Sequence, residues 1–343
     1  MKYRSEIDGL RAIAVVPVIL FHARFDLFSG GFVGVDVFFV ISGYLITTII
    51  INEMENGTFT LLRFYERRAR RILPSLFFVV LCCIPAAWFL LLPSDMKDFA
   101  QSVVAVATFS SNILFWIESG YFATEAELKP LLHTWSLAVE EQYYILFPLF
   151  LMAVWRSGLR AIVGLLILMF VVSLAVAHWG AYNNPSATFY LLPTRAWELL
   201  IGAFAAFYLQ RTSVSFPYWL NNWLSAFGLA AILYSVFAFD EATPFPSLYA
   251  LVPTAGTVLI ILFSLRGTWT HTILSLKSVV GLGLISYSLY LWHQPVFAFW
   301  RHYNLLEPAY TQMLSAAFIS FILAIFTFSL LGILALVSWL FSA

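Results

Sequence analysis

The chain has 343 residues, of which 62% are hydrophobic and only 10% are charged. An ordinary soluble domain carries about 25% charged residues, so water cannot be the main solvent of this chain. Its 18 basic and 18 acidic residues cancel, which leaves no overall field to attract nucleic acid or an acidic surface. The composition therefore indicates a membrane protein and excludes a nucleic-acid partner.

Apolar segments long enough to cross a bilayer, which takes about 20 helical residues, recur along the whole chain. No internal repeat and no soluble domain separates them, so we expect residues 1–343 to form a single all-α polytopic membrane domain. Eleven such segments can be counted, at residues 10–25, 33–51, 72–92, 99–117, 131–155, 161–178, 189–210, 223–239, 248–265, 279–300 and 310–341.

Loop charge reduces this count to about ten transmembrane helices. Lys and Arg collect in cytoplasmic loops, and five arginines at residues 63–71 place that loop and the N-terminus inside. Eleven crossings would put the basic residues at positions 156, 160, 211, 266 and 277 outside, whereas ten put all of them inside. We therefore expect ten crossings with both termini cytoplasmic.

One segment must then be re-entrant or peripheral. Segment 99–117 is the weakest span because it is rich in Ser, Thr, Gln and Asn. The element that does not cross is expected to be this segment or the stretch around His133, and irregular backbone at that depth is tolerated only beside a protein-enclosed cavity.

Arg11 and His22 are ionisable residues inside the first apolar segment. Intramembrane ionisable groups are costly and mark functional sites by default. Eleven positions leave the two about 20° from alignment on one helix face and about 16 Å apart, so they suit the two ends of one long ligand. The alternative is that Arg11 is a topology anchor and His22 a packed core histidine.

A glycine-rich turn at residues 30–34 leads into the second apolar segment, which carries Asp36 in its first turn and Ser42 further on. Glycines permit a tight turn, and a carboxylate is favoured at a helix N-terminus. Asp36 can therefore be a simple helix cap. A short turn would also keep it near His22, where a carboxylate orients an imidazole or raises its basicity.

Arg67, Arg68, Arg70 and Arg71 stand at the start of the third apolar segment. Four guanidiniums within five residues make a strong anion site, and arginine suits bidentate contact with phosphate. A nucleotide-bearing donor such as coenzyme A fits this reading. The alternative is a topology anchor or a contact with anionic lipid.

His133, Glu140 and Glu141 lie within two turns if residues 132–144 are helical. Two adjacent carboxylates in apolar surroundings are hard to ionise together, so we expect one of them to face a polar cavity. The alternative is that one pairs with a buried arginine.

Two further features lie in the second half of the chain. Arg195 and Glu198 stand at i and i+3, which suits a local structural ion pair. His293 is placed one turn before the outer end of its span, within aromatic residues that can also form an interfacial belt. No spacing suggests a metal site.

These motifs together resemble one family. They follow the family's order over nearly the whole chain, and any two of them would be hard to obtain by chance. The chain is similar to the acyltransferase-3 family of membrane O-acetyltransferases in IDGLRA at 7–12 with Arg11-x10-His22, GVDVFFVISGY at 34–44, Arg68-x-x-Arg71, HTWSL at 133–137 through Gln142, and SYSLYLWH at 286–293.

The resemblance implies that an acetyl group moves from cytoplasmic acetyl-coenzyme A to a hydroxyl of an extracytoplasmic glycan, such as O-antigen, peptidoglycan or exopolysaccharide. It implies a bacterial inner (plasma) membrane, acetyl-coenzyme A as donor substrate without a metal, and contact with membrane lipid and a glycan or lipid-linked glycan. Arg11 with His22 matches the family's Arg-x10-His motif and Arg68 with Arg71 its Arg-x-x-Arg motif. The overlapping Arg67 and Arg70 leave the second register open.

The mechanistic hypothesis follows from this match. Arg68 and Arg71 hold the nucleotide and phosphates while the pantetheine arm runs toward His22. His22, assisted by Asp36 or by a glutamate of the 140–141 pair, acts as base for the acceptor hydroxyl or as transient acyl carrier.

Three alternatives remain. Many relatives continue into a further span and an esterase-like domain, and the chain ends before either, so it can be a membrane half that needs a separate extracytoplasmic domain or protein. A glycan flippase or transporter would show internal repeats, which are absent. A purely structural membrane partner would need no coenzyme A site.

Overall fold

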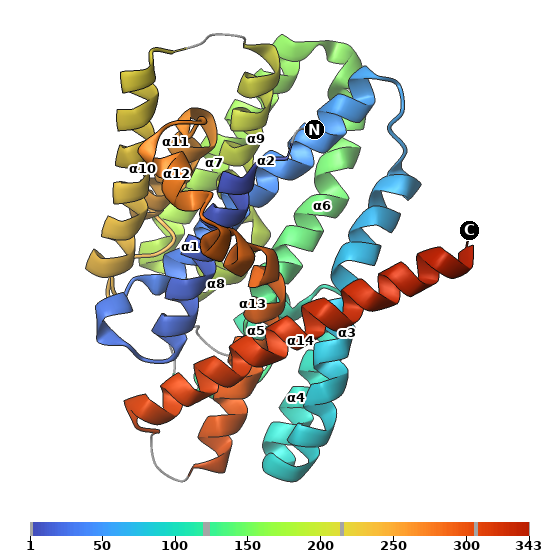
Figure 1. The fold of residues 1–343 in the computed structure, drawn as a ribbon, viewed down its shortest axis with the longest axis vertical. Coiled ribbons are helices and arrows are strands. Elements are labelled where there is room, and N and C mark those ends of the chain that lie inside the picture. Colours follow the sequence, from blue (N-terminus) through green and yellow to red (C-terminus); the bar gives the residue numbers. More distant parts are fainter. Residues whose placement is uncertain (1–2, 119–123, 213–215, 305–307, 343) are drawn as a thin grey trace.

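The computed structural model describes residues 3–118, 124–212, 216–304 and 308–342, and this part of the chain contains helices and no strand. The predicted all-α class is confirmed (Figure 1). The α-helices are α1 Ser5–His22, α2 Gly34–Glu55, α3 Leu61–Leu90, α4 Pro93–Ala107, α5 Ser111–Glu118, α6 Thr134–Val154, α7 Leu159–Asn183, α8 Pro185–Tyr190, α9 Leu192–Arg211, α10 Tyr218–Ala238, α11 Leu251–Phe263, α12 Trp269–Leu274, α13 Lys277–Tyr303 and α14 Tyr310–Ser342. Short 3-10 helices are η1 Asp26–Phe28, η2 Gly31–Val33, η3 Thr124–Leu128, η4 Trp155–Ser157 and η5 Leu248–Ala250.

The chain is a multi-pass membrane protein. Within the described residues, six helices are long and apolar enough to cross a membrane: Gly31–Glu55, Leu61–Leu90, Thr134–Ser157, Leu159–Asn183, Tyr218–Ala238 and Tyr310–Ile333. Helices α1, α9 and α13 have 18, 20 and 27 residues but carry buried ionisable groups, and Leu248–Phe263 is a shorter apolar helix. These ten are the candidates for the ten crossings, and that number stays a prediction.

The segment expected to be the weakest span does not form one helix. It is divided into α4 and α5, which have 15 and 8 residues and are both too short to span a bilayer. Phe109 at the break has a φ of 53°, a left-handed conformation that ends a helix. The hydroxyls of Thr108 and Ser110 both bond to the carbonyl of Ala105, which satisfies a carbonyl near the end of α4.

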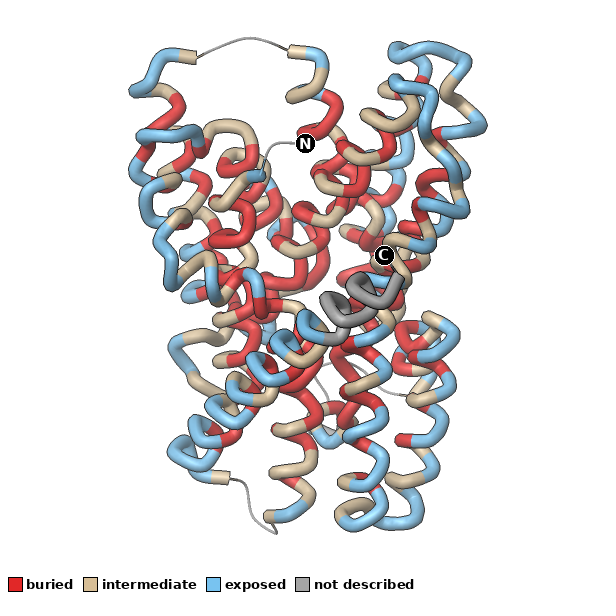
Figure 2. Tube along the Cα trace, turned by 45° about the vertical axis from the view of Figure 1, so that its right-hand side comes forward, coloured by how far each residue is buried: buried red, intermediate tan, exposed pale blue. Residues whose placement is uncertain are grey.

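The distribution of side chains is that of a protein surrounded by lipid. Only 17% of the most apolar stretch of α7 is buried, and large apolar side chains such as Leu168 and Val171 are exposed on it. Conversely, Asp36, Arg195 and His293 are fully buried. Figure 2 shows the buried residues along the inside of the bundle and the exposed ones on its outer surfaces.

Glycines allow α2 and α9 to pack with their backbones in contact. A Cβ added at Gly43 of α2 would lie 1.9 Å from the carbonyl oxygen of Leu199, and one added at Gly202 of α9 would lie 2.1 Å from that of Val40. Such distances are far below van der Waals contact, so any side chain must push the helices apart. Small residues at helix contacts are the usual means of close packing in membranes.

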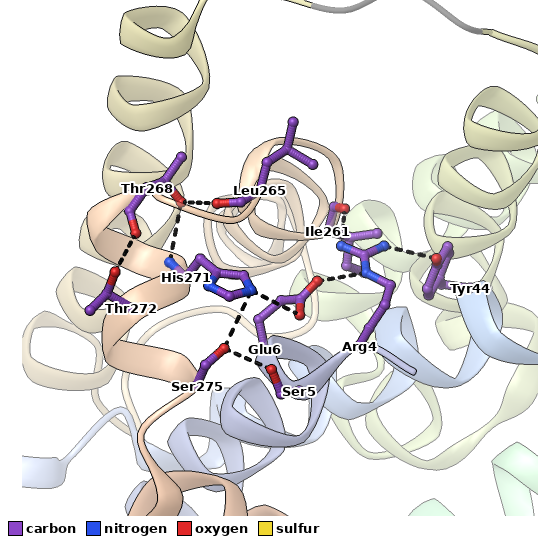
Figure 3. Close-up of polar contacts among 10 residues, drawn as sticks. All are labelled: Arg4, Ser5, Glu6, Tyr44, Ile261, Leu265, Thr268, His271, Thr272 and Ser275. Carbon is purple, nitrogen blue, oxygen red and sulfur yellow. Dashed lines mark hydrogen bonds and ion pairs between the residues drawn. The ribbon is translucent and has the colours of Figure 1, made fainter. Parts of the chain in front are cut away.

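The start of α1 is tied to three other helices by a polar network (Figure 3). The Arg4 guanidinium donates to Glu6, to the Tyr44 hydroxyl of α2 and to the carbonyl of Ile261 in α11. Glu6 lies 3.7 Å from His271 of α12. This network fixes the end of α1 from which Arg11 projects.

We predict that Gly43→Ala lowers the free energy of unfolding by about 1–3 kcal/mol, because the added methyl group overpacks the contact between α2 and α9. The control is Gly164→Ala in α7, where an added Cβ meets nothing within 4 Å and the change should be neutral or stabilising. Thermal unfolding of the purified protein in one detergent measures both variants. Equal behaviour of the two would contradict the close-packing argument.

Candidate functional site

A cavity of about 150 Å³ lies between α1, α2, α3, α6 and α13. Candidate residues from four of these helices reach it, and aromatic and aliphatic side chains from α2 and α13 complete its wall. The polar or charged lining consists of Arg11, Ser42, Arg68, Arg71, Ser136, Glu140, Tyr144, Ser286, Tyr287 and Tyr290. Arg71 is exposed to the surface, so the cavity has its mouth beside this residue of α3.

The four neighbouring arginines of α3 divide into two pairs. Arg68 and Arg71, three positions apart and therefore on one helix face, line the cavity. Arg67 forms an ion pair of 2.7 Å with Glu53, and Arg70 pairs with Glu66 at 2.7 Å on the exposed surface. The sequence left open which pair of arginines, 67 with 70 or 68 with 71, faces the site. In the structure Arg68 and Arg71 line the cavity, and Arg67 and Arg70 do not.

Arg11 reaches the cavity from α1. Its guanidinium makes an ion pair of 2.9 Å with Asp8, which neutralises part of its charge, and it lines the same cavity as Arg68 and Arg71. Three guanidiniums from two helices therefore converge on one space, which is a suitable site for an anionic group.

Only one of the two adjacent glutamates faces the cavity. Glu140 lines it and accepts hydrogen bonds from the Ser42 hydroxyl at 2.8 Å and the Tyr144 hydroxyl at 3.3 Å. Glu141 is buried and is not part of the lining. Neither carboxylate is within 4 Å of a basic group among the ion pairs of the described residues, so a direct pair with a buried arginine is not formed.

Tyr290 forms the wall between this cavity and His22. It lines the cavity, and its hydroxyl donates to the His133 carbonyl at 3.0 Å and lies 2.7 Å from the Ser136 hydroxyl. On its other side its ring contacts those of His133 and His293, with centroids 5.4 and 5.1 Å apart. One side chain therefore separates the arginine-lined cavity from a group of histidines.

His22 belongs to that group and not to the cavity lining. Its Nδ1 lies 2.8 Å from the Val18 carbonyl, and its ring centroid is 5.1 Å from that of His293. The predicted line from Arg11 toward His22 follows α1, but only its Arg11 end lies in the cavity lining.

The position of His293 differs from the prediction. It was expected one turn before the outer end of a span, whereas α13 continues to Tyr303 and His293 is fully buried. The aromatic residues beside it do not form an interfacial belt either, because Trp292 is buried and donates its indole N–H to Thr327 of α14. Packing of α14 across α13 (Figure 1) covers a face that hydropathy alone leaves open to lipid.

Arg195 is the centre of a second buried polar group. Its guanidinium lies 3.1 Å from Glu198, which confirms the predicted i, i+3 pair, and 3.4 Å from Asp36 of α2. It also lies over four aromatic rings at 5.3–5.4 Å, those of Phe39, Trp135, Phe189 and Phe245. This arrangement joins α2, α6, α8 and α9 around one charge.

The suggestion that Asp36 orients His22 is therefore wrong in geometry. The carboxylate of Asp36 is directed at Arg195, whereas the Nδ1 of His22 is held by a backbone carbonyl of its own helix. The sequence placed Asp36 correctly in the first turn of α2. It could not show that α9 packs against α2 with a buried guanidinium at that level.

We predict that Arg195→Met lowers the free energy of unfolding by about 3–5 kcal/mol, because two buried carboxylates lose their counter-ion. Arg211→Met on the same helix is the control. Its ion pair with Glu55 is about half exposed, so its loss should cost less than about 1 kcal/mol. Thermal unfolding in detergent compares the two, and similar shifts would refute a structural role for the Arg195 cluster.

Sequence reasoning did not predict the contact that α13 makes with the backbone of His22. Arg301 of α13 donates to the His22 carbonyl at 2.7 Å and lies 3.1 Å from Glu127, which also pairs with Arg24 at 2.9 Å. These residues are far apart in the sequence and carry no shared pattern. Tyr290 was detectable in principle, because it lies three residues before His293 and therefore on the same helix face.

Comparison with known proteins identifies the family. The sequence model of the family described as "Acyltransferase domain" matches residues 4–338. The chain belongs to this acyltransferase family. The match covers α1, α3, α6 and α13, which supply the residues of the cavity and the histidine group, and it confirms the resemblance found in the motifs.

Curated relatives carry related names. The chain is 34% identical over 313 residues to the peptidoglycan O-acetyltransferase OatA of Listeria monocytogenes, with 86% of this chain and 49% of that protein covered. It is 30% identical over 314 residues to the O-acetyltransferase OatA of Staphylococcus aureus, with 88% and 52% covered. The chain thus spans about half the length of these relatives. No solved structure matches it significantly.

Proposed function

We propose that this chain transfers an acetyl group from coenzyme A, bound on the cytoplasmic side, to a hydroxyl of an extracytoplasmic glycan. The observation that carries the proposal is the cavity in which Arg11, Arg68 and Arg71 converge, with Tyr290 in its lining and in ring contact with His293, which in turn contacts His22. A flippase would need no such juxtaposition of an anion site and a base.

The dimensions of the cavity suit one end of the donor. Its volume of about 150 Å³ resembles that of an engineered cavity that holds benzene. The acetyl thioester fits such a space, whereas a nucleotide does not. The phosphates would therefore lie at the mouth, where Arg71 is exposed and Arg68 lies one turn further along the same face.

The proposed reaction is a simple acyl transfer. The acceptor oxygen bonds to the acetyl carbon, the carbon–sulfur bond of the thioester breaks, and the hydroxyl proton passes through the imidazole of His22 to the departing thiolate. The Nδ1 of His22 faces the Val18 carbonyl, and a carbonyl only accepts. In the neutral ring Nε2 therefore carries the lone pair that a base requires.

The acceptor class is taken from the relatives. Because one relative is named a peptidoglycan O-acetyltransferase, peptidoglycan or its lipid-linked precursor is the first acceptor to test, in a bacterial plasma membrane. A second candidate is favoured by the half-length coverage of the relatives. In it, the chain passes the acetyl group to an extracytoplasmic, esterase-like domain or protein.

We predict that Arg68→Ala and Arg71→Ala each weaken binding of acetyl-coenzyme A roughly 10- to 100-fold, as expected for the loss of charge-assisted hydrogen bonds of about 1.5–3 kcal/mol. Arg67→Ala and Arg70→Ala are matched controls from the same helix and should change the affinity less than about threefold. Titration calorimetry on the purified protein in nanodiscs measures all four. An equal loss of affinity in all four variants would indicate that acetyl-coenzyme A is attracted by the overall surface charge and that Arg68 and Arg71 form no donor site.

We predict that His22→Ala leaves the affinity for acetyl-coenzyme A within about threefold but lowers acetyl transfer at least 100-fold, since general base catalysis typically contributes about 10²–10⁴. The assay supplies acetyl-coenzyme A and an N-acetylglucosamine oligosaccharide to the purified chain and detects the acetylated sugar by mass spectrometry. Product formed without any other protein would argue against the relay alternative. Normal transfer by the variant would disprove the role of His22.

A further inference from the structure

Three histidines from distant parts of the sequence meet beside the cavity. His22 ends α1, His133 directly precedes α6, and His293 lies within α13. The His293 ring lies 5.1 Å from that of His22 and 5.4 Å from that of His133, measured between centroids. Their exposed fractions are 7%, 3% and 0% in chain order, so the group is shielded from solvent.

The ring nitrogens of this group are only partly used. The Nδ1 of His293 lies within hydrogen-bond distance of the Tyr290 carbonyl, so in the neutral ring Nδ1 donates and Nε2 carries a lone pair. That Nε2 has no hydrogen-bond partner in the described structure, and neither nitrogen of His133 has one. A buried polar atom without a partner costs about 1–3 kcal/mol, so three such atoms together indicate a ligand-binding site.

A ligand that bonds these nitrogens must offer both a donor and an acceptor. The Nε2 lone pair of His293 requires a hydrogen-bond donor such as a hydroxyl. A neutral His133 has one N–H, which requires an acceptor such as a carbonyl oxygen. A metal is not favoured, because no group of three or more His, Cys, Asp or Glu side chains in the described residues could hold one.

Two spaces lie near residues that adjoin this group. On one side, Tyr290 separates the histidines from the arginine-lined cavity. On the other, Gln294 donates to the carbonyls of Glu127 and Lys129. Lys129 also lines a polar cleft of about 440 Å³, with Asp95, Asp98, Glu118 and His302 among its other lining residues.

We propose that the three histidines form one acyl-transfer site in which His133 donates its N–H to the carbonyl oxygen of the acetyl group, while His22 accepts the proton of the attacking hydroxyl. His293, whose ring contacts both of the others, is a positioning residue that holds His22 and His133 in place. The proposal deepens the proposed function and rests on it, since it requires an acetyl thioester and an alcohol as substrates.

The chemical role of His133 is charge stabilisation. When the hydroxyl oxygen bonds to the acetyl carbon, the carbonyl electron pair moves onto its oxygen, and the N–H of His133 stabilises that negative charge. The charge returns as the carbon–sulfur bond breaks, and the proton held by His22 passes to the thiolate. Removing one such donor typically lowers kcat by about 10²–10³, with little effect on substrate binding.

The test compares donor-retaining and donor-free replacements of His133. His133→Gln and His133→Asn keep an amide N–H near the positions of Nε2 and Nδ1, whereas His133→Phe and His133→Leu remove the donor at two different sizes. His178→Phe on α7, where the histidine contacts Tyr182, is the control for loss of a histidine elsewhere. Steady-state acetyl transfer to an N-acetylglucosamine oligosaccharide is measured per folded molecule, as judged by size-exclusion chromatography and thermal unfolding.

We predict that the apolar variants lower kcat by about 10²–10³ with KM for acetyl-coenzyme A within about threefold, and that the better of the two amide variants recovers at least tenfold of this loss. Recovery by His133→Gln would identify Nε2 of His133 as the donor, and recovery by His133→Asn would identify Nδ1. Equal loss in all four variants, or normal kcat in the apolar ones, would overturn the role of His133. If the wild-type chain forms no acetylated sugar and releases no coenzyme A, the proposed function fails instead.

Discussion

A charge inside a bundle of apolar helices must meet a counter-charge or a polar cavity, because its transfer from water is otherwise too costly. Arg195 shows the first solution. It lies between Asp36 and Glu198 within a cage of four aromatic rings, and this contact brings α2, α6, α8 and α9 together. Arg11, Arg68 and Arg71 show the second, because they line a common cavity. The same requirement therefore organises both the scaffold and the candidate site.

Close packing of helix backbones sets the depth of these charged groups within the bundle. At Gly43 and Gly202, α2 and α9 approach until no Cβ fits between them, and at Gly283 α13 approaches the Asp8 carbonyl of α1 in the same way. The second contact shapes the candidate site, since α1 carries Arg11 and His22 while α13 carries Tyr290 and His293. The backbone contact thus sets the cavity and the histidine group next to each other along the same two helices.

Tyr290 is the point at which the two halves of the site meet. Its hydroxyl is held by the His133 carbonyl and by Ser136, and its ring contacts two of the three histidines. Tyr290 therefore has one side toward the arginines and the other toward the histidines.

The sequence by itself determined the all-α membrane class, the family, the weakness of segment 99–117 as a span, the Arg195–Glu198 pair and most candidate residues of the site, because hydropathy, loop charge and i, i+3 spacing are local properties. Only the tertiary structure decided which arginines of α3 face the cavity, that Asp36 serves Arg195, that Glu140 and not Glu141 lines the cavity, and that His133 and His293 join His22. These outcomes depend on helix rotation and on contacts between residues more than 100 positions apart, such as His22 with Arg301. No pattern within one helix encodes which face its distant neighbours will cover.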